Sequence, residues 1–139
     1  MDYSALLLGS LLGLTSPAET VSTYELSAIT GLWALESADS CQERYNFGRD
    51  GKLTTVSGAE RTHGKYRFAY VETSPLPALA MHTTYDNNAP DCTGTQLDQT
   101  GNSSAVFVKL NHRHSPTRMQ WCSDPLGNDC PATLYRLLP

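Results

Sequence analysis

Short runs in which apolar and polar residues alternate cover the chain from Gly31 onward, and turn residues separate them. In the clearest run, Thr62–Tyr70, every second residue from Tyr66 onward is aromatic. A repeat of two is typical of a half-buried strand, and the runs are rich in aromatic and β-branched residues. Because no stretch after Gly31 has a helical repeat, the pattern predicts an all-β domain.

Eight strands are predicted. Asp50-Gly51 is a strong hairpin signal, Pro75 and Pro77 end one strand, and the only long connection is the polar segment Asp86–Asn102. The predicted strands are Gly31–Glu36, Cys41–Phe47, Lys52–Ser57, Thr62–Tyr70, Ala78–Tyr85, Ser104–Leu110, Arg118–Cys122 and Ala132–Leu137.

Strands joined mainly by short hairpins leave two exposed edges unless the sheet closes. An antiparallel up-and-down barrel removes those edges, whereas the alternative, a two-sheet sandwich, usually needs several long crossovers. We therefore expect an eight-stranded antiparallel barrel over residues 31–139.

The N-terminus differs from the rest of the chain. Ala5–Leu14 is apolar apart from one serine, and small residues follow it in Thr15–Ala18. This is typical of a secretory signal and short for a bilayer span, although the first four residues carry no positive charge. We expect a signal peptide over 1–18, a lead-in linker over 19–30, and a secreted or periplasmic protein without stable membrane insertion.

The four cysteines agree with export, because an even number in a small exported domain favours two disulfides. Zinc is a poor alternative, since no Cys-x-x-Cys pair is present. The formal net charge is −4 and the basic residues are scattered, which argues against a nucleic-acid partner.

Two elements carry a family resemblance: Gly31-Leu32-Trp33 opens the first predicted strand, and Arg136 lies in the last. This arrangement resembles the signature of the calycin superfamily, and the chain looks most like its small bacterial lipocalin-like domains. The resemblance implies that Trp33 plugs the closed end of the barrel and that Arg136 packs across its ring, both as structural residues.

If the strands alternate in direction from that closed end, the connections after strands one, three, five and seven meet at the open end. All four cysteines then lie there. Cys122 and Cys130 flank one hairpin and form the natural short pair, which leaves Cys41 with Cys92. A bond from Cys41 to Cys122 or Cys130 remains an alternative.

No catalytic motif is present: there is no Gly-x-Ser-x-Gly, phosphate loop or His-Glu-x-x-His. His112 and His114 fall in a predicted turn. Asp86, Asn88 and Asp91 do not have the spacing of a calcium-binding EF-hand loop. We expect a non-enzymatic protein without a metal or cofactor.

The open end is the expected binding surface, because long loops in compact domains are often functional. Its predicted segments are Ser37–Ser40, Gly58–Arg61, Asp86–Asn102 and Ser123–Asp129, and its predicted rim residues are Asp86, Asn88, Asp91, Asp98 and Asp124.

Two functions fit these features. The barrel binds a small or hydrophobic ligand in its interior, or it is packed solid and its acidic loops bind a basic protein, as in lysozyme-inhibitor-like barrels. A cavity of a few hundred cubic ångströms would separate them.

Overall fold

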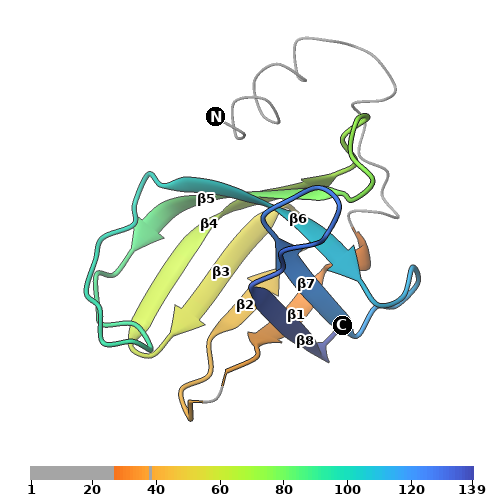
Figure 1. Ribbon diagram of the computed structural model, residues 1–139. Helices are drawn as coiled ribbons and strands as arrows, with labels where there is room; N and C mark the ends of the chain where they lie inside the picture. Colours follow the sequence, from red (N-terminus) through yellow and green to blue (C-terminus); the bar gives the residue numbers. More distant parts are fainter. Residues whose placement is uncertain (1–26, 38) are drawn as a thin grey trace.

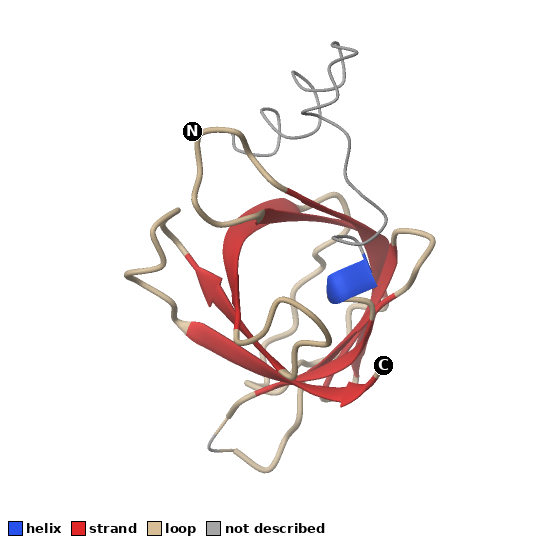
Figure 2. Ribbon diagram, turned by 90° about the vertical axis from the view of Figure 1, so that its right-hand side faces the viewer, coloured by secondary structure: helices blue, strands red, loops and turns tan. Residues whose placement is uncertain are grey.

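The computed structural model describes residues 27–37 and 39–139, and its eight strands form one closed antiparallel barrel (Figure 1, Figure 2). Each strand pairs with its sequence neighbours, and β8 pairs with β1, so the predicted up-and-down barrel is confirmed. The predicted signal peptide and residues 19–26 of the lead-in lie outside the described residues. The strands are β1 (Gly31–Leu35), β2 (Arg44–Phe47), β3 (Lys52–Ser57), β4 (Glu60–Ala69), β5 (Ala78–Asp86), β6 (Ser103–Leu110), β7 (Arg118–Cys122) and β8 (Ala132–Leu138).

Both predicted disulfides are present, Cys41–Cys92 and Cys122–Cys130. Paired cysteines of this kind are typical of an oxidising compartment. The first bond holds Cys41 against the β5–β6 loop, and β2 begins at Arg44, later than the sequence pattern predicts. No helix among the described residues is long and apolar enough to cross a membrane.

Trp33 and Arg136 close one end of the barrel as expected. Trp33 is fully buried, and the Arg136 guanidinium lies 4.4 Å from the centre of its ring. The guanidinium also donates hydrogen bonds of 2.7 Å each to the backbone carbonyls of Pro116 and Ala28. Gly31 is required beside this contact, because it has a φ of 120° and a Cβ there would lie 2.4 Å from a β8 carbonyl oxygen.

The end of the lead-in contributes to the same closure. A helical turn at residues 27–28 precedes Ile29, which is fully buried, and the carbonyl of Ile29 accepts a 2.9 Å hydrogen bond from the Trp33 indole. Trp33 and Ile29 belong to an apolar core in the closed half of the barrel, with Phe47, Leu53, Tyr66, Phe68, Leu79, Val108, Met119 and Leu134.

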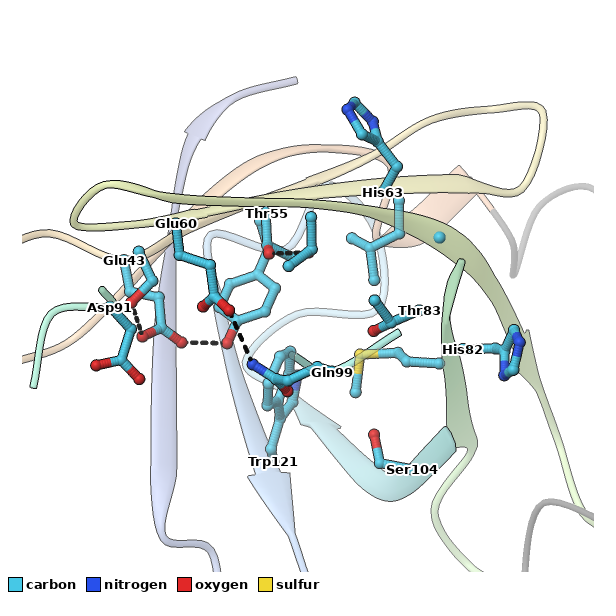
Figure 3. Close-up of a pocket in the computed structure, with 16 residues that line it drawn as sticks. Glu43, Thr55, Glu60, His63, His82, Thr83, Asp91, Gln99, Ser104 and Trp121 are labelled. Atoms are coloured by element: carbon cyan, nitrogen blue, oxygen red, sulfur yellow. Dashed lines mark hydrogen bonds between the residues drawn. The ribbon is translucent and has the colours of Figure 1, made fainter. Parts of the chain in front are cut away.

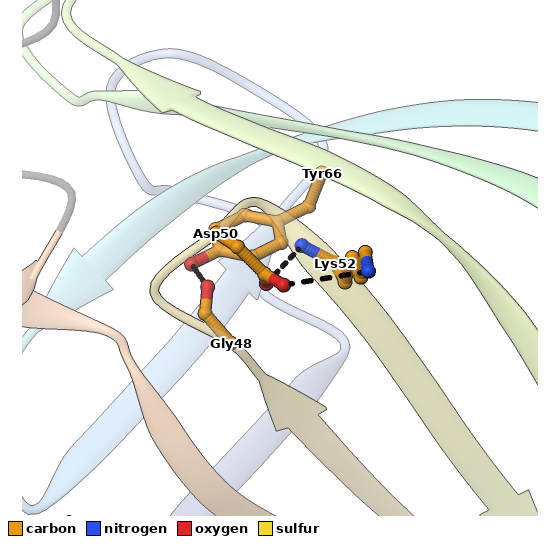
Figure 4. Close-up of polar contacts among 4 residues, drawn as sticks. All are labelled: Gly48, Asp50, Lys52 and Tyr66. Carbon is orange, nitrogen blue, oxygen red and sulfur yellow. Dashed lines mark hydrogen bonds and ion pairs between the residues drawn. The ribbon is translucent and has the colours of Figure 1, made fainter.

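The β2–β3 hairpin turns at Asp50-Gly51, as predicted. Gly51 has a φ of 83°, and the Asp50 side chain accepts a 3.1 Å hydrogen bond from the Lys52 amide. The Tyr66 hydroxyl reaches across from β4 and donates to the Gly48 carbonyl at 2.6 Å (Figure 4). Burial, followed by the nearby Asp50 charge, raises the pKa of Tyr66 to about 12, so this hydroxyl remains a donor.

Candidate functional site

The inward-facing positions change from apolar to polar along the barrel axis. On β3, Leu53 packs in the core, and two residues further on Thr55 faces the interior of the open half. On β4, Tyr66 belongs to the core, whereas Thr62 and Glu60 line the open half. Because strand side chains alternate between faces, residues two apart share the interior, and β3 and β4 therefore each carry both kinds of surface.

This polar half encloses a cavity of about 250 Å³ (Figure 3). His63 and His82 border it through β4 and β5, but Figure 3 shows their rings pointing away from it. The residues that line it include Glu43, Tyr45, Ser57, Glu60, Met81, Thr83, Asp91, Gln99 and Trp121.

One hydrogen-bond network joins Glu43 to the β5–β6 loop, which the Cys41–Cys92 disulfide holds in place. The Tyr45 hydroxyl donates to one oxygen of the Glu43 carboxylate, and the Ser57 hydroxyl donates to the other at 2.9 Å. Ser57 in turn accepts a 3.0 Å bond from the Cys92 amide, next to the disulfide. Burial, together with the neighbouring Glu43 charge, raises the pKa of Tyr45 well above its usual value, so Tyr45 stays protonated and keeps donating.

A second network surrounds Glu60, which is only 5% exposed. Its carboxylate accepts a 3.3 Å hydrogen bond from the Gln99 side chain and interacts with Asp86. Burial, with the hydrogen bond to Asp86 as the next cause, raises the pKa of Glu60 to about 7. Burial acts in the same direction on Asp86, but backbone hydrogen bonds from Gln99 and Asn88 outweigh it and lower the pKa of that residue. Glu60 is therefore the member of the pair that holds a proton near neutral pH.

The cavity contains more acid than the neighbouring residues balance. Glu43, Glu60 and Asp91 all line it, and none forms an ion pair with any residue that the structure describes. The indole N–H of Trp121 is buried and has no hydrogen-bond partner among the described residues. The unbonded indole is unusual, because buried donors are normally bonded, whereas Glu60 avoids the cost of an unpaired buried charge by holding its proton near neutral pH.

The predicted rim residues lie at different places in the loops. Asp86 is turned inward beside Glu60, and Asn88 follows it in a left-handed conformation. Asp91 accepts backbone hydrogen bonds from Thr93 and Thr95, and Asp98 accepts one from Thr100, so these carboxylates shape their own loop. Only Asp91 of the five predicted rim residues lines the cavity.

Asp124 lies apart from the other rim residues. Its carboxylate accepts hydrogen bonds from the Asn128 and Asp129 amides, and the Gly127 carbonyl of the same loop accepts a 2.9 Å bond from the Lys109 ammonium on β6. This β7–β8 loop turns back along the outer face of β6 and does not join the open end (Figure 1). The reason is the length of β7, which ends where Cys122 pairs with Phe107, part-way along β6.

Glu60 falls in the predicted open-end segment Gly58–Arg61 but not among the predicted rim residues, and Glu43, Tyr45 and Trp121 are not predicted as part of the binding surface. The signal for Glu60 was present in the alternation, because it stands on the same face of β4 as the aromatic residue Tyr66. A carboxylate in the inward-facing series indicates a polar interior.

Metal ligation has no support in the described part of the chain, where no three His, Cys, Asp or Glu side chains are grouped to hold an ion. Comparisons of the sequence with protein-family models and with curated proteins, and of the structure with solved structures, each found no match.

Proposed function

We propose that this chain is an exported, non-enzymatic, lipocalin-like protein that binds a small molecule in the open half of its barrel. The observation that carries the proposal is the cavity of about 250 Å³ between the apolar core and the disulfide-bonded β5–β6 loop. A barrel built only for stability would fill this space with side chains, as the closed half does.

The lipocalin-like assignment is supported by the closed end. Gly31, Trp33 and Arg136 occupy the places that the calycin resemblance implies, and the β1–β8 pairing brings Trp33 opposite Arg136. Export is supported by the two disulfides and by the apolar run near the N-terminus.

The size and lining of the cavity restrict its ligand. Its volume lies just below the range of roughly 300–1,000 Å³ that ligand pockets usually span, and equals about eight water molecules at liquid density. Three carboxylates and several hydroxyl groups line it. A small polar molecule therefore suits it better than a long hydrocarbon.

Binding of a basic protein at the rim has weaker support. The side chains of Asp86, Asp91, Asp98 and Asp124 accept hydrogen bonds from their own loops, and Asp124 lies away from the other three. These contacts give the acids a structural role that needs no partner.

A fragment screen by NMR tests the proposal. Small polar fragments are added to ¹⁵N-labelled, disulfide-intact protein, and we expect shifts to concentrate on the Trp121 indole N–H and on the Thr83 amide. The Thr83→Phe variant should abolish them, because Thr83 lines the cavity and a phenyl ring would fill it.

The matched control is Thr84→Phe, one residue further along β5, where the side chain is exposed and does not line the cavity. This variant should bind as the parent does. Fragments that bind Thr83→Phe as well as they bind the parent protein would refute a function in the cavity.

A further inference from the structure

We propose that the natural ligand of the cavity is a small organic monocation, with an ammonium or guanidinium group on a short body that also carries a hydrogen-bond acceptor. This inference rests on the proposed function, since it names the chemical class of molecule that the cavity would hold.

Carboxyl groups from three different parts of the fold line the cavity and favour a positively charged ligand. Glu43 precedes β2, Glu60 begins β4, and Asp91 lies in the β5–β6 loop; Figure 3 shows the three carboxylates on one side of the cavity. Glu60 is 5% exposed and forms no ion pair with a described residue. Ionising such a buried carboxyl group without a counter-charge is costly, which is why Glu60 holds a proton near neutral pH. A cation bound beside it would offset that cost and allow Glu60 to ionise.

The carboxylates also have unused hydrogen-bonding capacity. Each oxygen of Glu43 already accepts one bond, from Tyr45 or Ser57, and can accept a second. Glu60 receives only one bond from the Gln99 side chain, at the long distance of 3.3 Å, apart from its contact with Asp86. An ammonium group brings three donors, which matches this excess of acceptors.

The body of the ligand is defined by a different group of residues. The buried Trp121 indole N–H has no partner among the described residues and requires an acceptor. Its ring packs edge-to-face on Tyr45, with centroids 5.0 Å apart, and Met81 adds an apolar surface to the cavity wall. A short apolar or aromatic body with one oxygen acceptor would satisfy the N–H and contact these side chains.

Other charge classes fit less well. An anion would face Glu43, Glu60 and Asp91, and the basic side chains among the lining residues, His63 and His82, turn their rings away from the cavity (Figure 3). A divalent metal ion would need three ligands held close together, and the described residues contain no such group.

Three probes that share one body but differ in charge test the inference directly: tyramine (cationic), tyrosol (neutral) and 4-hydroxyphenylpropionate (anionic). Isothermal titration of each into unmodified, disulfide-intact protein at neutral pH requires no variant to fold. We expect tyramine to bind at least tenfold more tightly than tyrosol, and the anion to give no measurable binding.

Equal affinities for tyramine and tyrosol would overturn the cation assignment and leave the proposed function standing. If none of the three probes binds while other fragments still shift the cavity residues, the cation assignment also fails by itself. If no fragment of any charge shifts them, the proposed function fails as well.

Substitutions locate the charge effect. Glu60→Gln keeps the size of the side chain and can still hydrogen-bond, so we expect tyramine affinity to fall at least tenfold and tyrosol affinity to stay within twofold. Asp98→Asn is the control, because it makes the same carboxyl-to-amide change at an exposed position that does not line the cavity. An equal loss of tyramine affinity in both variants would overturn the inference, since it would show a general effect of net charge.

Discussion

Replacing Trp33 by leucine and Arg136 by methionine, singly and together, tests how the barrel is closed. Trp33 is fully buried, and truncation of a large buried aromatic residue costs about 3–5 kcal/mol of unfolding free energy; leucine, which refills part of the space, should cost about 3 kcal/mol. Arg136→Met leaves the carbonyls of Pro116 and Ala28 without their charged donor, which should cost about 2–4 kcal/mol.

The informative quantity is the coupling between the two losses. The guanidinium lies 4.4 Å from the ring centre, and a partly desolvated cation–π contact is worth about 1–2 kcal/mol. The double variant should therefore lose about 1–2 kcal/mol less than the sum of the single variants, measured by urea unfolding followed by circular dichroism. In a control cycle, Lys65→Met on the exposed outer face of β4 replaces Arg136→Met and should show additive losses. Additivity within about 0.5 kcal/mol for the Trp33 and Arg136 pair would refute the contact as a source of closure energy.

Three further predictions concern the open half of the barrel and its β4–β5 pair. Burial and Asp86 raise the pKa of Glu60 from 4.5 to about 7 in the folded protein, so its contribution to stability is present below pH 4.5 and is lost as the pH rises through 7. The free energy of unfolding should therefore fall by on the order of 1–3 kcal/mol from about pH 5 to about pH 8. The same fall with pH in the Glu60→Gln variant would contradict this. The Cys41–Cys92 bond spans 51 residues, and its replacement by two serines should lower the free energy of unfolding by about 4 kcal/mol in chemical denaturation. A loss below about 1 kcal/mol would show that the β5–β6 loop stays closed without the bond. A Cβ on Gly64 would lie 2.1 Å from the His82 carbonyl oxygen, so Gly64→Ala should lower the thermal midpoint through a loss of about 1–3 kcal/mol, and an unchanged midpoint would refute this close approach.

The barrel and its disulfides could be predicted from the sequence because local rules determine them. Period-two alternation defines the strands, and Asp50-Gly51 sets one hairpin. Strand direction then brings Cys41 and Cys92 to the same end, and both predicted pairings are found. A slip of one residue would reverse the faces of a strand, so the same pattern restricts the register to shifts of an even number of residues.

The cavity could not be predicted in the same way, because it depends on how completely side chains from opposite walls fill the interior. Alternation shows that Glu60 faces inward, but it does not show that Trp121 is left without a hydrogen-bond partner. The pKa of Glu60 depends on its burial beside Asp86, which the β4–β5 pairing and the β5–β6 loop create together. The position of Asp124 depends on the pairing of Cys122 with Phe107, part-way along β6, which the correctly predicted end of the strand at Cys122 does not reveal.

The change from an apolar to a polar interior along the barrel axis has a consequence for how such a protein can diversify. The residues that dominate packing, such as Trp33 and Phe47, lie in the closed half, whereas the cavity side chains lie in the open half. Exchanges among the latter would change the shape and polarity of the cavity while leaving most of the buried apolar area intact. Mutational tolerance should therefore form a gradient along the axis, and a library randomised at Thr55, Thr83 and Ser104 should retain a high fraction of folded members. The same architecture would then serve as a scaffold whose cavity can be altered from one end.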